Sequence, residues 1–436
     1  MRRFAAAMII LALVFTMTSC RNNENLSSDS KNALRICIDI TYVDSDEEQR
    51  YIEDFLFSLR ETGGLESVVI EMIPKSGSER ETAITRIRTE LMAGGGPDVF
   101  IVDCPFNTEH IEPVFPFPEK VMEAGLFLPL DEYMENSTEF TEWDKMQSVV
   151  LAAGQNEEGQ QIIPLSYTFP IQTCQTTDFT LEMPDKLVTW QDTLTDPRLS
   201  AVYARFDDCV DVDYGHKMDG SLVLGISYNQ YFEHVLGKLA DFEEEELLFT
   251  EEELLERINE ILVLQEDAEY EENSIFKDQF MGSTVVNDSP IPVTMMPMYS
   301  DDGGIAVSIR NFAAVNRNTK HPEEAYRVID VLLRTQQLTK PLYTDGLCRC
   351  GDILESVPLN DAAFHKDTPF KLRSFSDESY ARFSQVKEQI TAANFQSSLS
   401  YDLYMLMLEC KRENDPVVRE TLVHEAYVQM QRKVRE

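Results

Sequence analysis

The chain has 436 residues with 43% hydrophobic and 26% charged residues, which is ordinary for a globular protein, but its formal net charge is −39. A surface this acidic repels phosphate backbones and anionic lipid headgroups, so we expect no nucleic-acid partner. The length exceeds what one compact core usually holds, and we therefore expect two lobes.

The N-terminus has the pattern of an export signal. Arg2 and Arg3 precede an apolar run over residues 4–15, and Met17-Thr18-Ser19-Cys20 follows. A run this short is typical of a secretory signal rather than of a membrane-spanning helix. The end of the segment resembles the lipobox of bacterial lipoproteins, which implies removal of residues 1–19 and lipidation of Cys20. An ordinary signal peptide and an uncleaved anchor are the alternatives.

Residues 20–33 follow as a polar segment rich in Asn, Ser and Asp. We interpret this segment as a flexible tether between the lipid and the folded domain. The remaining cysteines are odd in number and irregularly spaced, which does not indicate a disulfide framework: Cys37, Cys104, Cys174, Cys209, Cys348, Cys350 and Cys410.

Strands and helices are predicted to alternate from residue 34 onward. Strand patterns cover residues 34–40, 68–73 and 98–103, and amphipathic helix patterns cover residues 47–60 and 79–92. This alternation predicts an α/β fold with a parallel sheet and right-handed crossovers, in which the apolar third strand is central. Ligands of such sheets bind beyond the carboxyl ends of the strands.

The rest of the chain is predicted to be more helical. Pro118 begins a short helix, and Pro322 fits the first turn of a helix with one apolar face. Thr250 and Glu253 form a capping box ahead of a further apolar helix. Two more helices are predicted near the C-terminus, one around residues 401–408 and one that starts at residues 415–416.

The order of these segments resembles extracellular solute-binding protein family 1, the lipid-anchored receptors of ABC importers. Besides the lipobox, three segments carry the resemblance: residues 88–99 with their glycine break and Pro97-Asp98, residues 160–165, and residues 303–326. The resemblance implies a type II periplasmic-binding-protein-like fold, with two α/β lobes and a hinge crossed by several strands. It also implies a first lobe of residues 34–165 and about 305–345, and a second of residues 166–304 and about 346–436.

Candidate ligand-binding residues follow from this topology, because strand ends and hinge loops border the cleft. Aromatic rings would stack on a sugar while carboxylates bind its hydroxyl groups. A ring in an open cleft would pack against little, so we expect its loss to weaken binding and to leave the stability of the empty protein nearly unchanged. Taken singly, each residue is better explained as ordinary surface or core, and the topology favours them as a set. The candidates are Tyr42, Asp103, Tyr167 with its neighbour Phe169, Tyr299 and Asp301.

Sequence signatures of an enzyme are absent. The chain has no G-x-S-x-G nucleophile motif, no H-E-x-x-H metal motif and no phosphate-binding loop. Paired carboxylates for glycoside hydrolysis stay open in so acidic a chain, although nothing singles out a pair. We therefore predict no catalytic residues, no metal and no cofactor.

These observations together predict a lipid-anchored receptor on the extracytoplasmic face of the cell membrane. We expect a monomer that captures a small solute, a sugar or an oligosaccharide, by hinge closure and delivers it to ABC permease subunits. Two alternatives stay open. The first is a secreted lipoprotein hydrolase, and the second is a lipoprotein that uses the same fold for sensing or adhesion.

The lipid anchor can be tested at Cys20, the only attachment point that the lipobox resemblance offers. Cys20→Ser should give a soluble or unprocessed protein, because stable membrane residence of a lipidated protein requires its acyl chains. The measurement is detergent phase partitioning of wild type and variant after expression in a bacterium. A mature Cys20→Ser protein that still partitions into the detergent phase would show that the anchor does not depend on this cysteine.

Overall fold

The structure is a computed structural model that describes somewhat more than half of the chain. The described ranges are residues 32–40, 48–104, 112–137, 143–175, 250–266, 277–280, 293–297, 303–334, 356–360, 377–395 and 412–435, with single residues at positions 141, 299, 340, 399, 402, 405, 406, 409 and 410. Cys20 and the signal lie outside these residues, as does most of the helix predicted around residues 401–408.

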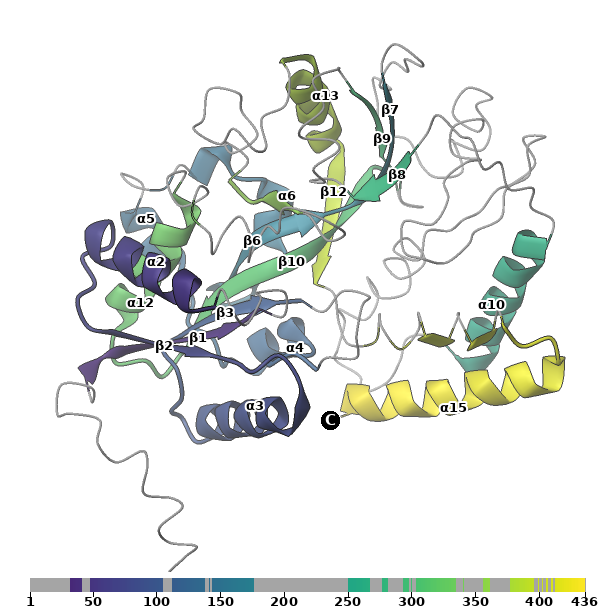
Figure 1. Ribbon diagram of the computed structural model, residues 1–436, viewed down its shortest axis with the longest axis horizontal. Coiled ribbons are helices and arrows are strands. Elements are labelled where there is room, and N and C mark those ends of the chain that lie inside the picture. The colour runs from purple at the N-terminus through teal and green to yellow at the C-terminus, as the bar shows by residue number, and fades with distance from the viewer. Residues whose placement is uncertain are drawn as a thin grey trace, which may run out of the picture.

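The described elements alternate between strands and helices in the first part of the chain, as predicted (Figure 1). The strands are β1 (Leu34–Asp39), β2 (Val68–Met72), β3 (Val99–Asp103), β4 (Gln155–Asn156), β5 (Gly159–Gln160), β6 (Ile162–Thr168), β7 (Pro170–Gln175), β8 (Lys277–Phe280), β9 (Val293–Pro297), β10 (Ile305–Val315), β11 (Val357–Pro358) and β12 (Ile390–Phe395). The helices are α2 (Glu48–Glu61), α3 (Gly77–Met92), α4 (Pro118–Glu123), α5 (Asp131–Asn136), the 3-10 helix η2 (Trp143–Lys145), α6 (Ser148–Ala152), α10 (Glu251–Glu266), α12 (Pro322–Leu333), α13 (Asp377–Lys387) and α15 (Pro416–Arg435).

The larger sheet has the strand order β11-β6-β10-β3-β1-β2, and β12 also pairs with β10. Strands β1, β2 and β3 are parallel, while β10 runs antiparallel to β3 and β6. The prediction that residues 98–103 form a central strand is confirmed, since β3 lies between β1 and β10. Figure 1 shows α2 and α12 on one face of this sheet and α3 on the other.

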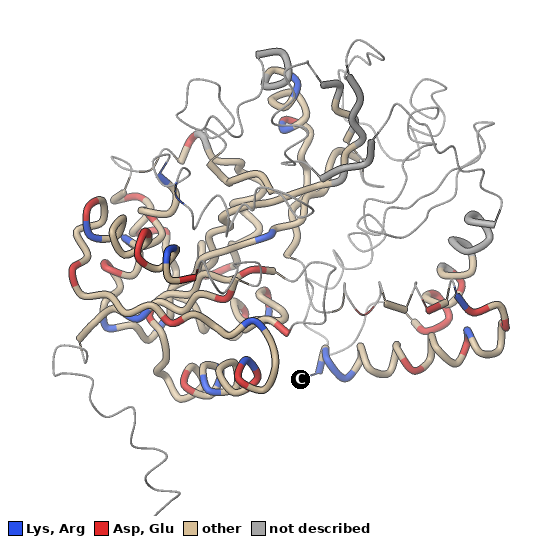
Figure 2. Tube along the Cα trace, viewed as in Figure 1, with Lys and Arg blue, Asp and Glu red and all other residues tan. Residues whose placement is uncertain are grey.

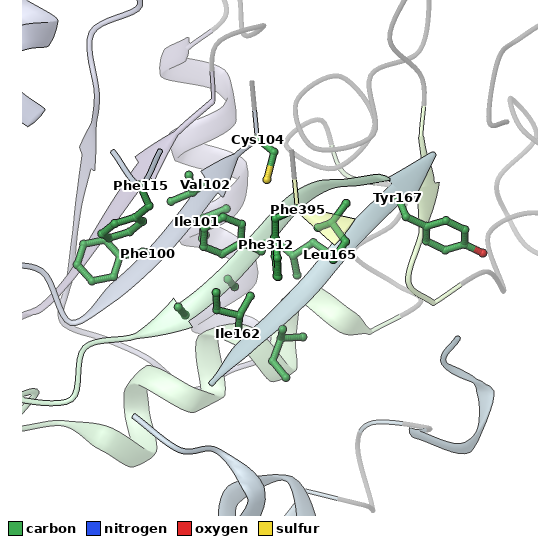
Figure 3. Close-up of a cluster of buried hydrophobic side chains, with 14 of the residues drawn as sticks. Phe100, Ile101, Val102, Cys104, Phe115, Ile162, Leu165, Tyr167, Phe312 and Phe395 are labelled. Atoms are coloured by element: carbon green, nitrogen blue, oxygen red, sulfur yellow. The ribbon is translucent and has the colours of Figure 1, made fainter. Parts of the chain in front are cut away.

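The core of the larger sheet contains several phenylalanine rings in mutual contact, of which Phe100, Phe115, Phe312 and Phe395 are labelled in Figure 3 and Phe115 and Phe312 lie 6.5 Å apart in a tilted arrangement. Phe115 packs against Phe100 at a centroid distance of 5.1 Å and against Phe127 at 5.2 Å, and Phe312 packs against Phe395 at 5.5 Å. Edge-to-face pairs add about 0.5–1.5 kcal/mol each beyond their burial. The rings therefore link β3, β10 and β12 to the segment between β3 and α4.

The segments that carry the family resemblance meet at the amino ends of β1 and β3. Asn316 donates from Nδ2 to the carbonyl oxygens of Gly95 and Pro97 at 2.7 and 2.9 Å. The Asp98 carboxylate accepts hydrogen bonds from the Thr319 hydroxyl at 2.6 Å and the Arg35 amide at 2.8 Å. These bonds join the glycine break before β3 to the turn after β10. The motif residues therefore stabilise the fold at the edge opposite the predicted ligand site.

A second, smaller sheet follows directly along the chain. Its strand order is β8-β7-β9, with antiparallel pairs throughout, and β7 begins only two residues after β6 ends. Strands β11 and β12, which the sequence analysis placed in the second lobe, pair with β6 and β10 of the larger sheet. The exact boundaries of the two lobes stay a prediction.

The residues predicted to begin helices are found at helix N-termini in the structure. The Thr250 hydroxyl accepts a hydrogen bond from the Glu253 amide at 3.2 Å, and the Glu253 carboxylate accepts one from the Thr250 amide at 2.8 Å, which confirms the capping box of α10. Pro322 occupies the first turn of α12. None of the helices within the described residues is both long enough and apolar enough to span a membrane.

Glu119 in α4 has a carboxyl group that is largely removed from water. The residue keeps some solvent contact, but burial of its carboxyl raises the pKa to about 7, with Glu123 adding to the shift and the Phe395 amide opposing it. A pKa raised by folding means that the protonated form stabilises the native state, so this stability is present below pH ~4.5 and is lost as the pH rises through about 7.

Glu119→Gln should therefore melt at a higher temperature than wild type at pH 8 and should lose this advantage at pH 4.5. The neutral amide still accepts a hydrogen bond and has no charge to desolvate. The measurement is the melting temperature across this pH range, with the exposed Glu81→Gln variant of α3 as control. A difference between Glu119→Gln and wild type that does not change with pH would contradict the assignment.

Candidate functional site

The candidate site begins with a row of polar side chains across three adjacent strands. Asn311 of β10 lies directly opposite Asp103 of β3 on one side and Ser166 of β6 on the other. Asn311 Nδ2 donates to Asp103 Oδ1 at 2.9 Å, and the Ser166 hydroxyl donates to Asn311 Oδ1 at 2.5 Å. We call Asp103, Asn311 and Ser166 the polar row. It lies at the carboxyl end of β3, where the topology predicts ligand binding.

The polar row is buried within strands that are otherwise apolar. At most 3% of the surface of each of the three residues is exposed. Burial of polar groups and of a carboxylate costs free energy unless hydrogen bonds satisfy them, so a row of this kind requires its partners. Further buried polar side chains flank it on β6 and β10: Thr168, Ser308 and Arg310.

Strand β10 changes its partner next to the polar row. Residues 305–309 pair with β12 in parallel, whereas residues 311–315 pair with β3 in antiparallel orientation. The register with β6 shifts on both sides of Asn311, and the Arg310 carbonyl accepts a hydrogen bond from the Cys104 amide at 2.6 Å. Irregularities of this kind bend a strand and redirect its side chains. The irregularity in β10 therefore lies at the candidate site.

Aromatic rings lie where the chain passes from the larger sheet to the smaller one. The rings of Tyr167 and Phe169 are stacked with centroids 6.5 Å apart and planes 12° apart. Tyr299 follows β9 by two residues, and the last β7–β9 pair is Ile171 with Pro297. Continuing this register by two residues would set Tyr299 opposite Phe169. Figure 3 shows the Tyr167 ring directed away from the apolar cluster of the larger sheet.

The structure brings some of the predicted site residues together. Asp103 and Tyr167 lie on strands separated only by β10, and Tyr167 directly follows Ser166 of the polar row. Tyr299 is near the smaller sheet, where burial raises the pKa of its phenol and the nearby Arg382 opposes the shift. Tyr42 and Asp301 lie outside the described residues, so their place in the site stays a prediction.

One expectation about these rings is wrong. The sequence analysis expected the ligand-stacking rings to pack against little in the empty protein. Tyr167 is 0% exposed and Tyr299 is 1% exposed, so both rings are part of the packed interior in this structure. The physical reason for Tyr167 is its position on β6, where β10 and β11 pair with it on either side and the Phe169 ring stacks on the Tyr167 ring.

The sequence analysis also missed two members of the polar row, Ser166 and Asn311. A signal for Asn311 was present, because polar side chains interrupt the long apolar strand at Ser308, Arg310 and Asn311. Their alignment with Asp103 depends on the register between strands, which periodicity within one strand does not reveal.

The described residues offer little for catalysis. They contain no group of three or more His, Cys, Asp or Glu side chains that could hold a metal ion. Burial raises the pKa of the Cys37 thiol, and it raises that of Cys410 to about 11, which keeps these two groups protonated at neutral pH. A buried thiol of this kind is unreactive, because the thiolate is the nucleophile.

Comparisons with known proteins show which solved structures have a similar fold. No protein-family model and no curated protein matches the sequence. Among solved structures, the bacterial solute receptor AcbH, described as having an exclusive preference for β-D-galactopyranose, is similar with a TM-score of 0.55 and 12% identity, over 94% of this chain and 100% of that one. A periplasmic oligogalacturonide-binding protein from Yersinia enterocolitica is similar with a TM-score of 0.50 and 14% identity, over 92% and 99%.

A designed enzyme is also similar. The de novo designed cysteine esterase ECH19 has a TM-score of 0.54 and 14% identity, over 92% of this chain and 98% of that one. Identities this low establish the fold and leave the activity to be argued from the site. The chain therefore has the mixed α/β fold of the two-lobe periplasmic solute-binding proteins, which confirms the predicted fold class.

The burial of Tyr167 changes what its removal should do. Tyr167→Ala should lower the free energy of unfolding by about 3–5 kcal/mol, as for other large buried aromatic residues, because the cavity leaves the stacked Phe169 without its partner. Tyr167→Phe keeps the ring and serves as the matched control. The measurement is urea unfolding of both variants. A Tyr167→Ala protein as stable as wild type would show that the ring is not part of the core.

Proposed function

We propose that this protein is a lipid-anchored, extracytoplasmic solute-binding protein that captures a small saccharide by hinge closure and delivers it to an ABC permease. The observation that carries the proposal is the junction between the two sheets. There the chain passes directly from β6 to β7, with a buried carboxylate, amide and hydroxyl on one side and stacked aromatic rings on the other.

The chemistry of this junction suits a carbohydrate. A sugar presents C–H faces that pack on aromatic rings and hydroxyl groups that donate to a carboxylate. Asp103 supplies the carboxylate, and Tyr167, Phe169 and Tyr299 supply the rings. Because these groups are buried in the present structure, a solute would reach them through an opening movement of the two sheets about the irregular part of β10.

The net charge supports a neutral solute. Acidic side chains are spread over α2, α3, α10 and α15 rather than confined to one region (Figure 2). With a net charge of −39, the field around the protein repels anions. A neutral hexose or oligosaccharide, of the kind that AcbH binds, is therefore favoured over an acidic sugar such as an oligogalacturonide.

The anchor and the permease enter the proposal from the sequence. The lipobox-like end at Cys20 supports attachment to the membrane surface, and residues 20–33 would give the folded part its reach. A receptor held at the membrane delivers its solute without diffusing away, which is the advantage of a tether. The partner would be the permease subunits of an importer.

The proposal is tested by binding without turnover. D-galactose, D-glucose and maltotriose should be titrated into the soluble protein (residues 21–436) by calorimetry, and digalacturonate serves as the acidic comparison. We expect at least one neutral sugar to bind and to reduce the radius of gyration measured by small-angle X-ray scattering, and digalacturonate to bind more weakly or not at all. Prolonged incubation followed by mass spectrometry should recover the sugar unchanged.

Asp103→Asn is the informative variant. The amide keeps the shape of the side chain and an acceptor for Asn311, but it removes the charge that would receive sugar hydroxyls. We expect affinity to fall about tenfold, since a hydrogen bond to a charged group is worth about 1.5–3 kcal/mol. Failure of every neutral sugar to bind would overturn the proposal, and steady formation of product would favour the hydrolase alternative.

A further inference from the structure

Arg80 has an unusually complete set of partners for a buried side chain. It lies in the first half of α3 and is 4% exposed. A guanidinium group carries five N–H donors in a planar fork. In this structure five hydrogen bonds involve it. Two go to Asp39, from Nη1 to Oδ1 at 2.7 Å and from Nη2 to Oδ2 at 3.1 Å.

The other three bonds go to backbone carbonyl oxygens. Nη1 donates to Pro74 at 3.0 Å, and Nε and Nη2 donate to Glu112 at 3.1 and 2.8 Å. The Asp39 carboxylate is also fully engaged, because its Oδ2 accepts a further hydrogen bond from the Val114 amide at 2.9 Å. The buried charges of Asp39 and Arg80 therefore compensate each other within a closed network.

The acceptors of Arg80 share one place in the topology. Asp39 is the last residue of β1, Pro74 follows the end of β2, and Glu112 lies on the segment that leads away from β3 to α4. One guanidinium group thus joins the ends of β1 and β2 to the segment before α4. The carboxyl ends of parallel strands are the general position of ligand sites in α/β sheets.

Arg88, two turns further along α3, extends the same contact. Its Nε donates to the Val114 carbonyl at 2.9 Å, its Nη2 to the Pro113 carbonyl at 2.8 Å, and its Nη1 to the Glu112 carboxylate at 2.7 Å. Residues 112–114 are therefore held by two arginines of one helix. Three consecutive backbone carbonyls receive a fixed donor, so this segment has little freedom relative to α3.

We propose that Arg80 is a positioning residue for solute binding, which fixes the ends of β1 and β2 against the segment before α4 so that the carboxyl edge of the larger sheet keeps one shape. This inference rests on the proposed function. Arg80 acts through Asp39 and the carbonyls and does not itself touch the solute. A buried ion pair contributes little net stability compared with an apolar pair, so positioning explains its presence better than stabilisation does.

The chain contains a matched control pair. Asp330 lies in α12, and Arg334 directly follows that helix. Their side chains form a second ion pair at 2.6 Å that has little contact with solvent. Arg334 Nη1 also donates to a backbone carbonyl, that of Thr62 just after α2, at 3.2 Å. This pair lies near the turn before β2, at the opposite edge of the sheet from Asp39. Arg334→Met therefore removes a comparable interaction away from the candidate site.

The first experiment requires no ligand. Hydrogen exchange should be measured on peptides that contain Val114, whose amide donates to Asp39, in wild type, Arg80→Met and Arg334→Met. We expect exchange of this peptide to increase by about tenfold or more in Arg80→Met and to stay near the wild-type rate in Arg334→Met, after correction for global stability. Equal protection in the two variants would overturn the proposal.

The second experiment uses binding. The dissociation constant for D-galactose, or for the neutral sugar that binds wild type most tightly, should rise about tenfold in Arg80→Met and less than about twofold in Arg334→Met, as is typical of residues that orient a site from behind. Arg80→Lys keeps the charge but not the fork, so it should recover little affinity. Equal affinities of Arg80→Met and Arg334→Met would also overturn the inference.

If Arg80→Met fails to fold, a double variant without either charge can be used instead. Asp39→Leu/Arg80→Met replaces the pair by apolar side chains and should restore stability, but the carbonyls of Pro74 and Glu112 stay without their donor. We expect a stable protein with weak binding, and binding is the readout here because Asp39→Leu itself removes the acceptor of the Val114 amide. A stable double variant that binds the sugar as tightly as wild type would assign Arg80 to stability alone. If wild type binds none of the sugars, the proposed function fails and the exchange measurement still decides the positioning role.

Discussion

Strand β10 is the element on which the rest of the structure depends. All eleven of its residues are buried, and it pairs with β3, β6 and β12. A strand in this position must satisfy its backbone on both sides, so it fixes the register of its neighbours. Its partner changes from β12 to β3 at Arg310, where its register with β6 is also irregular. The polar row exists because Asn311, just beyond that point, lies opposite both Asp103 and Ser166.

Different interactions stabilise the larger sheet at the amino ends and at the carboxyl ends of its strands. At the amino ends of the strands, Asn316 and Asp98 close the fold through bonds to backbone and hydroxyl groups. At the carboxyl ends, Arg80 and Asp39 form a buried charged network. Burying charge is expensive, and hydrophobic residues would hold a scaffold equally well. Such a network is therefore best explained by a need for a defined shape at the edge where the ligand is expected.

The fold alone is compatible with solute binding and with catalysis, and the residues at the candidate site favour solute binding. Similar folds occur in AcbH, a solute receptor, and in ECH19, a designed cysteine esterase. Catalysis by a cysteine would require an accessible thiol with a base, whereas burial keeps the thiols of Cys37 and Cys410 protonated. The junction between the sheets instead combines hydrogen-bonding groups and aromatic rings. These are the elements of a binding site, which is why we infer capture of a solute rather than its conversion.

The sequence by itself determined the local elements and the fold class. Periodicity, capping residues and glycine breaks act within a few residues, so β1 to β3, α3 and the capping box of α10 were predictable with small errors at their ends. Only the tertiary structure decided the candidate site. Asn311 is 208 residues from Asp103 and 145 from Ser166, and Arg80 is 41 from Asp39. Contacts over such separations depend on strand register and helix placement, which no local pattern encodes. The burial of Tyr167 has the same origin, because two sheets must meet before the ring is enclosed.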